Sequence, residues 1–187
     1  MNRPPMRLVI LDRDGVINCD SDRFIRSPQE WIPIPGSLEA IGRLHRAGCT
    51  IVVATNQSGV GRGLFDLEQL ERIHAKMLEA VREAGGKIDG IFFCPHRPDE
   101  NCECRKPRPG LLKRIAETLD VDLRDACLVG DSRRDILAAR RVAAAPVLVR
   151  SGKGRRTLEQ NPELEDTPVF DDLAAFVDDF LSDEQVK

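Results

Sequence analysis

Apolar residues occur along the chain in two alternating kinds of segment. Short continuous apolar runs, such as residues 7–11 and 50–54, are typical of strands buried on both faces of a parallel sheet. Between the runs, apolar residues recur at helical spacing, as in residues 38–47. The pattern predicts strands over residues 7–11, 50–54, 88–94, 126–129, 147–149 and 169–170, and helices over residues 38–47, 67–81, 111–119, 133–142 and 173–181. Alternating strands and helices predict a doubly wound, Rossmann-like α/β fold with a parallel sheet and right-handed crossovers.

The length of 187 residues suits a single domain over residues 1–187, with a frayed tail after residue 182. Hydrophobic residues make up 41% and charged residues 32%, which is an ordinary balance for a globular protein. About 20 residues separate Gly15 from the first predicted helix, so we expect no large cap domain over the sheet.

The net charge of -3 argues against a general surface for nucleic acid or membrane. No apolar run approaches the roughly 20 residues of a membrane span, and the apolar stretch before Asp12 is too short for a signal peptide. We therefore expect a cytoplasmic protein that binds neither nucleic acid nor membrane. No long apolar surface is evident, which favours a monomer.

Polar side chains follow the predicted strands at the points where the strands end. Asp12 and Asp14 follow the first strand, Thr55 the second and Asp131 the fourth, while the loop after the third strand leads to Lys106. In doubly wound sheets ligands bind beyond the carboxyl ends of the strands. We therefore expect these side chains to converge on one edge of the sheet.

The segment 11–16 reads Leu-Asp-Arg-Asp-Gly-Val. Side chains two residues apart in an extended chain point the same way, which would direct Asp12 and Asp14 to the crevice and Arg13 away from it. Two adjacent carboxylates need a cation, and Mg²⁺ prefers such oxygen ligands, with Asp131 able to complete the site. One carboxylate could be a nucleophile and the other a general acid and base. The alternative is a turn with two solvated acids.

Other polar groups at the strand ends suit phosphate. The hydroxyl, amides and N–H groups of residues 55–59, Thr-Asn-Gln-Ser-Gly, could bind phosphate oxygens, or they could form an ordinary loop. Lys106 could offset the charge of a transferring phosphoryl group, although an isolated lysine is usually a surface residue. Asp135 could orient Lys106 or a metal-bound water, or simply favour the start of a helix.

Three cysteines and one histidine lie within eleven residues, in the zinc loop 94–104. Cys94, His96, Cys102 and Cys104 supply a complete tetrahedral set of zinc ligands, which indicates a structural rather than a catalytic zinc. Such a metal would fold a polar loop and aim Arg105 and Lys106, which follow it.

Together these groups resemble the haloacid dehalogenase (HAD) superfamily of phosphohydrolases. The resemblance spans residues 8–149 and rests on Asp-Arg-Asp-Gly at 12–15, Thr55, Lys106 and Gly-Asp at 130–131. It implies that Asp12 is the nucleophile, that Asp14 is the general acid and base, and that Thr55 and Lys106 steady the phosphoryl group. It also implies Mg²⁺ held by the Asp12 carboxylate, the Asp14 backbone carbonyl and Asp131.

The zinc loop resembles one branch of this superfamily, which holds heptose bisphosphate phosphatases and histidinol-phosphate phosphatases. Asn-Gln-Ser-Gly-Val-Gly-Arg-Gly at 56–63 is closer to the heptose branch, whereas the short spacer between His96 and Cys102 also fits the histidinol branch. The resemblance implies hydrolysis of the 7-phosphate of D-glycero-D-manno-heptose 1,7-bisphosphate, in nucleotide-heptose synthesis for lipopolysaccharide. Histidinol phosphate remains the alternative substrate, and the anomer is left open.

A sugar bisphosphate needs a second cationic site, because only one phosphate reacts at Asp12. Expected substrate-binding residues are Asp20, Ser21, Asp22, Arg23, Asn56, Gln57, Ser58, Arg62 and Arg105, with Arg105 as the main candidate for the second phosphate. Trp31 could form a wall of the pocket or simply pack in the core. An alternative of another class is a non-catalytic module that uses the zinc loop to bind a partner. The intact set of acids, Thr55 and Lys106 argues against it.

Overall fold

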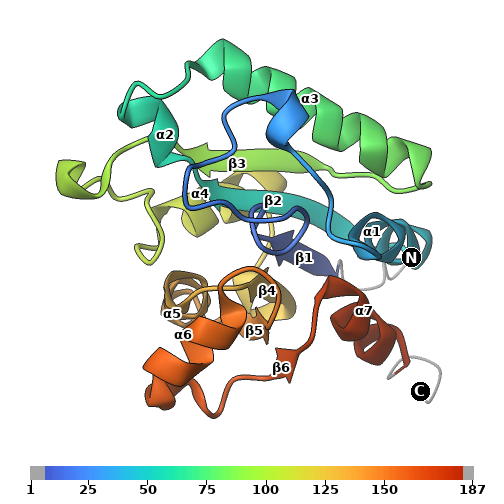
Figure 1. The fold of residues 1–187 in the computed structure, drawn as a ribbon. Helices are drawn as coiled ribbons and strands as arrows, with labels where there is room; N and C mark the ends of the chain where they lie inside the picture. The colour runs from blue at the N-terminus through green and yellow to red at the C-terminus, as the bar shows by residue number, and fades with distance from the viewer. Residues whose placement is uncertain (1–6, 183–187) are drawn as a thin grey trace.

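Six parallel strands form one sheet at the centre of the structure, a computed structural model that describes residues 7–182 (Figure 1). The strands are β1 (Leu8–Leu11), β2 (Thr50–Asn56), β3 (Gly90–Cys94), β4 (Ala126–Gly130), β5 (Ala145–Val149) and β6 (Val169–Phe170). Their order across the sheet is β3-β2-β1-β4-β5-β6, and every neighbouring pair is parallel. In this register Leu8 lies opposite Thr50 on one side and Ala126 on the other.

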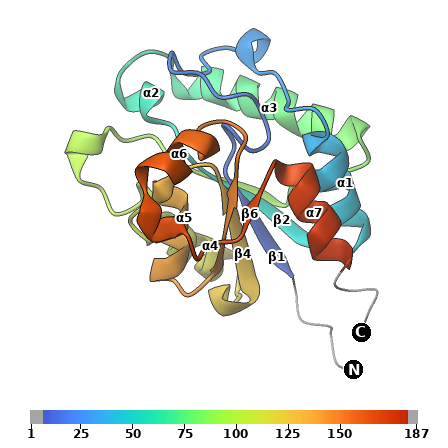
Figure 2. The same ribbon diagram turned by 60° about the horizontal axis from the view of Figure 1, so that its bottom comes forward.

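Helices cover both faces of the sheet. They are α1 (Ser37–Arg46), α2 (Ser58–Gly61), α3 (Leu67–Glu83), α4 (Gly110–Leu119), α5 (Arg133–Arg141), α6 (Gly154–Gln160) and α7 (Leu173–Ser182). Val9 and Leu11 of β1 pack with buried side chains of α1, α3 and α7, and α7 lies against α1 in both views (Figures 1 and 2). Leu8 and Ile10 point to the opposite face and pack with α4 and α5. Burial on both faces explains why β1 is apolar throughout.

The strand order places a crevice at β1. Chain connections run from β1 toward β2 and β3 on one side and toward β4, β5 and β6 on the other, so the topology reverses beside β1. Ligands bind at such switch points, beyond the carboxyl ends of the strands. Residues 12–36, between β1 and α1, contain only the short 3-10 helix Pro28–Glu30. The expected doubly wound sheet without a large cap domain is confirmed.

The predicted elements all occur, with ends shifted by one or two residues in most cases. The short helices α2 and α6 were not predicted. Asp66 caps α3 as its sequence position suggests, because its side chain accepts a hydrogen bond from the Gln69 N–H at 2.8 Å. Within residues 7–182, no helix combines the length and apolar character that crossing a membrane requires. The predicted frayed tail after 182 lies outside the described residues.

Candidate active site

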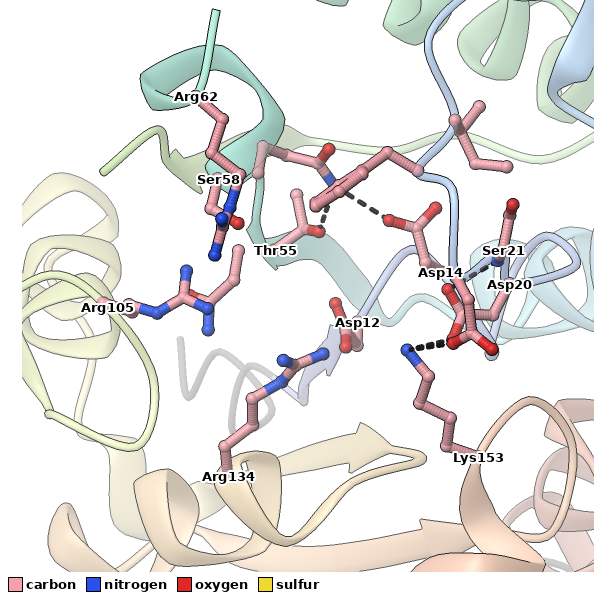
Figure 3. A pocket seen from close by; sticks show the side chains of 15 residues that line it. Asp12, Asp14, Asp20, Ser21, Thr55, Ser58, Arg62, Arg105, Arg134 and Lys153 are labelled. Carbon is pink, nitrogen blue, oxygen red and sulfur yellow. Dashed lines mark hydrogen bonds and ion pairs between the residues drawn. The ribbon is translucent and has the colours of Figure 1, made fainter. Parts of the chain in front are cut away.

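A pocket of about 240 Å³ opens at the carboxyl ends of β1 and β2, beside the start of α5 (Figure 3). Its lining contains most of the predicted site residues, namely Asp12, Asp14, Asp20, Ser21, Asp22, Thr55, Asn56, Gln57, Ser58, Arg62 and Arg105, together with Phe24, Ile25, Arg134 and Lys153. Lys106 and Asp131 are buried beneath this lining. Topology has therefore brought together groups that are up to about 140 residues apart in the chain.

Asp12 lies at the bottom of the pocket and is nearly inaccessible, at 3% exposure. Its Oδ1 accepts a hydrogen bond from the Arg13 N–H at 2.8 Å and lies 3.2 Å from Lys106 Nζ. Burial raises the pKa of Asp12 to about 6, although the charge of Lys106 opposes the rise. Lys106 Nζ is also 2.6 Å from Asp135 Oδ1, so two carboxylates hold the ammonium group in place. Of the roles considered for Asp135, the geometry matches both the orientation of Lys106 and the start of a helix, because Asp135 Oδ2 accepts the Ser132 N–H at 3.1 Å.

Asp131 follows β4 and stands close to Asp12. Ligand oxygens of Asp12, Asp131 and Asp135 all lie within 4.8 Å of one another. Oδ1 of Asp131 is buried and has no hydrogen-bond partner among residues 7–182, whereas Oδ2 accepts the Lys153 N–H at 2.8 Å. Burial and the neighbouring charges of Asp12 and Asp135 raise the pKa of Asp131 to about 8. Crowded carboxylates with a free buried oxygen fit a divalent cation such as Mg²⁺, which would offset their repulsion.

Asp14 is held in place by the side chain of its neighbour Arg13. Arg13 is fully buried, and its Nε and one terminal nitrogen each donate to the Asp14 carboxylate at 3.0 Å. Asn18 and Gln57 each donate a further hydrogen bond to this carboxylate, at 2.9 Å. Burial alone would raise the pKa of Asp14, but Arg13 and these hydrogen bonds hold it below its ordinary value. Arg13 lies outside the pocket lining, as expected, but its contact with Asp14 was not predicted.

The backbone explains how Arg13 reaches Asp14. The alternation of side chains assumes an extended chain, but a turn begins at Arg13, whose carbonyl accepts the N–H groups of Ile17 and Asn18 at 2.9 and 3.2 Å. Gly15 within the turn has a φ of +84°, a conformation that other residues adopt rarely. The turn folds Arg13 back over its own neighbour, Asp14.

His74 of α3 completes the hydrogen bonding of Arg13, with its Nε2 3.3 Å from a terminal nitrogen of the guanidinium. Burial and the charge of Arg13 lower the pKa of His74 to about 3, so the imidazole is neutral. Because a guanidinium can only donate, Nε2 must accept and the ring proton must reside on Nδ1. No local sequence signal connects His74 with Arg13.

The amides after β2 bond mainly to protein groups. Gln57 Nε2 donates to Thr55 Oγ1 at 2.8 Å as well as to Asp14. Asn56 exchanges two hydrogen bonds with the backbone of Lys106, with donor–acceptor distances of 3.0 and 3.1 Å. These contacts fix Thr55 and Lys106 relative to Asp14, and Asn56 and Gln57 also reach the pocket lining.

Arginines form the wall of the pocket opposite Asp14. Arg62 and Arg105 lie on either side of Ser58, and Arg134 extends from α5 toward Asp12 (Figure 3). Arg105 donates to the carbonyl of His96 at 3.3 Å, which ties it to the zinc loop. Burial and the neighbouring cations Arg134 and Arg62 lower the pKa of Arg105. Like charges gathered in this way favour an anionic ligand.

The loop after Asp14 approaches the other side of the pocket. Lys153 Nζ is 2.8 Å from an Asp20 carboxylate oxygen and 3.7 Å from Asp22, which ties residues 20–22 to the start of α6. Arg23 is exposed and is not part of the pocket lining, so its expected role has no contact to support it. Trp31 is 1% exposed within the core, which corresponds to the packing interpretation and not to a pocket wall.

The four predicted zinc ligands meet at one point. His96 Nδ1 lies 3.3 Å from Cys104 Sγ and 3.6 Å from Cys94 Sγ, while Cys102 Sγ lies 3.5 Å from Cys94 Sγ and 3.6 Å from Cys104 Sγ. Tetrahedral zinc, with Zn–S of about 2.3 Å and Zn–N of about 2.0 Å, separates its ligand atoms by roughly 3.5–3.8 Å. The four donors therefore fit zinc closely, and the cluster can hold it as predicted.

Comparisons with known proteins agree with this geometry. The HAD-hydrolase-like family model matches residues 103–176. A D-glycero-beta-D-manno-heptose-1,7-bisphosphate 7-phosphatase from Bordetella bronchiseptica is 54% identical over 178 residues, covering 95% of this chain and 99% of the relative. The enzyme of that name from Pseudomonas aeruginosa is 57% identical over 168 residues, covering 90% of this chain and 94% of the relative.

The fold also matches a solved structure. The crystal structure of the D,D-heptose 1,7-bisphosphate phosphatase from B. bronchiseptica, complexed with magnesium and phosphate, superposes with a TM-score of 0.92 at 54% identity, over 95% of this chain and 99% of that one. Identity at this level, over nearly the whole of both chains, goes well beyond a shared fold. The chain belongs to the HAD-like phosphatase family.

Proposed function

We propose that this protein hydrolyses the 7-phosphate of D-glycero-β-D-manno-heptose 1,7-bisphosphate through a phospho-aspartate formed on Asp12. The observation that carries the proposal is the distribution of charge in the pocket. A buried carboxylate with a lysine lies at the bottom, while Arg62 and Arg105 lie apart from it on the wall. Such a pocket suits a substrate with one reacting and one distant phosphate. The names of the relatives support the heptose and its β anomer.

The chemistry we propose uses two carboxylates in turn. An Asp12 oxygen attacks phosphorus and forms the Asp12–O–P bond, while the bond from phosphorus to the sugar oxygen breaks. Asp14 must first take up a proton, against the effect of Arg13 on its pKa, and it donates this proton to the leaving alkoxide. The carboxylate that results then takes a proton from the water that cleaves the phospho-aspartate. Thr55 and Lys106 hold the phosphoryl oxygens, and Lys106 balances their charge. The contacts of Asp14 with Arg13 and Gln57 keep its carboxylate on the pocket side of the loop.

Both metals have candidate ligands within the described residues. Mg²⁺ would be held by the Asp12 carboxylate, the Asp14 carbonyl and Asp131, and it would neutralise charge between the nucleophile and the phosphate. The relative solved with magnesium and phosphate supports this assignment. Zinc would be held by the Cys94–Cys104 cluster in a structural role.

We take the single sheet with its covering helices as one domain. We further propose that the protein is a monomer and is located in the cytoplasm. Its reaction would serve nucleotide-heptose synthesis for lipopolysaccharide. The mild net charge of -3 supports the expectation that nucleic acid is not a partner. Sedimentation analysis of the purified protein would test the monomer.

The test of function is phosphate release with Mg²⁺ from the β and α anomers of heptose 1,7-bisphosphate and from histidinol phosphate, measured side by side. We expect kcat/KM to be highest for the β anomer. A higher kcat/KM for histidinol phosphate would assign the protein to the histidinol-phosphate phosphatases instead. Phosphate release from none of the three would leave the non-catalytic module as the better interpretation.

Replacing Arg105 by alanine should impair use of the bisphosphate selectively. A charged hydrogen bond to phosphate contributes about 1.5–3 kcal/mol, so kcat/KM for heptose 1,7-bisphosphate should fall by roughly 10- to 100-fold. Heptose 7-phosphate, which lacks the second phosphate, should be affected much less. Arg97→Ala is a matched control, since Arg97 is an exposed arginine of the zinc loop outside the pocket lining. Equal losses on both substrates would contradict the assignment of Arg105.

Gly15→Ala should damage the magnesium site through Asp131. A Cβ atom at Gly15 would lie only 2.1 Å from Asp131 Oδ2, so the carboxylate must move. We expect magnesium affinity to fall by about 10- to 100-fold, measured by titration calorimetry. Gly48→Ala is the control, because Gly48 has a similar φ of +81° but no atom within 4 Å of the added Cβ. Both variants should lose about 1–2 kcal/mol of stability from the left-handed backbone, and equal magnesium affinity in both would exclude the proposed clash.

A further inference from the structure

Arg134 is an arginine of the pocket wall without a partner. It is the second residue of α5, and its side chain extends toward Asp12 (Figure 3). Among the described residues its guanidinium forms no hydrogen bond and no ion pair, and its Nε is buried without a partner. A buried polar nitrogen without a hydrogen bond is costly, and native structures contain few of them. Sequence reasoning did not single out this residue.

Although burial disfavours the charged form of Arg134, the charges of Asp135, Asp12 and Asp131 favour it and raise its pKa. Two other features of the position disfavour a cation. The first turn of a helix carries the positive end of the helix dipole, which repels an arginine. Arg105 stands near enough for the two cations to disfavour each other, as the lowered pKa of Arg105 reflects. Arginine stays protonated at any physiological pH, so the charge of Arg134 cannot be removed by loss of a proton. An anion between these groups would relieve all of these costs.

The nearby carboxylates attract Arg134 but are engaged elsewhere. Asp12 and Asp135 both bind Lys106, at 3.2 and 2.6 Å, and Asp20 binds Lys153 at 2.8 Å. The third acid of the metal-binding group, Asp131, accepts the Lys153 N–H and offers its free oxygen to a cation. Arg134 is therefore directed at the reacting carboxylate while its donors remain free.

We propose that Arg134 binds the phosphoryl group that Asp12 attacks. This inference rests on the proposed function. During the attack the Asp12–O–P bond forms and the bond to the leaving oxygen breaks, while negative charge stays on the three remaining phosphoryl oxygens. The fork of the guanidinium can donate two parallel hydrogen bonds to two of these oxygens, and no proton is transferred. Lys106 can turn at most one N–H to the phosphoryl group, because its ammonium group also binds Asp135 and the carbonyl of Ala54.

Arg62 and Arg105 lie in a different part of the pocket from Arg134. Figure 3 shows Arg62 and Arg105 beside Ser58, away from Asp12, whereas Arg134 points to Asp12 itself. The arginines thus divide between the two phosphates of a bisphosphate. Loss of Arg134 should impair every phosphate ester that reacts at Asp12, and loss of Arg105 only those with a second phosphate.

The experiment compares Arg134→Gln with Arg133→Gln in the intact magnesium-loaded protein. Arg133 is the neighbouring arginine of α5, but it is half exposed and pairs with Glu163 at 2.7 Å on the surface. Binding of inorganic phosphate is measured by titration calorimetry, and kcat/KM is measured with heptose 7-phosphate and heptose 1,7-bisphosphate. For Arg134→Gln we expect phosphate affinity to fall about tenfold and kcat/KM to fall about 10²-fold on both substrates. Arg133→Gln should match the wild type.

Two results would overturn the proposal. One is wild-type phosphate affinity in Arg134→Gln, and the other is a loss confined to the bisphosphate, which would assign Arg134 to the second phosphate. Arg134→Lys keeps the charge without the fork, so it preserves the test if Arg134→Gln fails to fold. Failure of the proposed function is distinguishable, because a wild type that hydrolyses neither heptose can still bind phosphate in a manner that depends on Arg134.

Discussion

Asp12→Asn is expected to abolish phosphate release, with a loss of about 10⁴-fold or more in kcat. Asparagine has nearly the shape of aspartate, but its amide cannot attack phosphorus to form the covalent intermediate. Burial has already removed Asp12 from water, and Lys106 lies 3.2 Å from its oxygen, so the carboxylate is oriented for attack. The substitution removes the reacting group and little else.

The fold should survive this substitution. Asp135 stays 2.6 Å from Lys106 Nζ, so the buried ammonium keeps a partner, and one of three crowded carboxylates loses its charge. Circular dichroism and the melting temperature should therefore stay close to those of the wild type. The control is Asp125→Asn, because Asp125 is an exposed aspartate outside the pocket lining. Retention of more than a tenth of the wild-type kcat by a folded Asp12→Asn protein would exclude the phospho-aspartate mechanism.

The site residues that sequence predicted correctly share one property, which is that their position follows from the sheet. Asp12 and Asp131 directly follow parallel strands, and Thr55 is the second-last residue of β2, so the topology alone brings the three together. The zinc ligands were predictable for a different reason. Four donors within eleven residues lie close together in nearly any fold of the loop. Three thiolates and one imidazole are also the ligands that zinc prefers.

The contact between Arg13 and Asp14 could not be predicted, because it depends on a turn and not on a strand. The alternation of side chains was applied to residues 12–14, which lie past the end of β1 at Leu11. The fully buried Arg13 also contacts His74, which is 61 residues later in the chain. No local sequence pattern indicates this contact. Tertiary contacts of this kind are visible only once the helices are packed.

Arg134 and α6 were missed for related reasons. Arg134 stands between Arg133 and Asp135 in a polar helix start, where sequence alone offers no criterion for which arginine turns inward. The helix α6 has seven residues, Gly-Arg-Arg-Thr-Leu-Glu-Gln, with a single large apolar side chain, so it shows no helical periodicity. Its start supplies the Lys153 N–H to Asp131 and the Lys153 ammonium to Asp20, so an unpredicted element shapes the pocket.

Removal of zinc is expected to destabilise the protein strongly while leaving the phosphoryl chemistry comparatively intact. A metal present at about 1,000 times its dissociation constant stabilises the folded state by about 4 kcal/mol, which corresponds to a fall of roughly 8–16 °C in melting temperature for a domain of this size. The effect should reach the core because Cys94 is fully buried and ends β3. Calorimetry before and after chelation, with metal content verified, would measure it.

The catalytic consequences should differ between two adjacent residues. Lys106 is anchored independently of the zinc loop, by Asn56 at 3.0 and 3.1 Å and by the carbonyl of Ala54 at 2.6 Å. Arg105 is anchored to the carbonyl of His96, a zinc ligand, so the loss of zinc should release it. The comparison is made at temperatures where the zinc-free protein stays folded. The ratio of kcat/KM for the bisphosphate to kcat/KM for heptose 7-phosphate should then fall by a larger factor than kcat on the monophosphate.

Cys102→Ser should reproduce the effects of zinc removal without a chelator, since it removes one of the four ligands. Cys19→Ser is the matched control, because Cys19 is an exposed free cysteine far from the cluster in sequence. An unchanged melting temperature after verified zinc loss would contradict the structural role of the metal. Equal losses of kcat on both substrates would instead mean that the loop positions Lys106 as strongly as Arg105, and that the hydrogen bonds of Asn56 and Ala54 do not suffice to hold the reacting lysine in place.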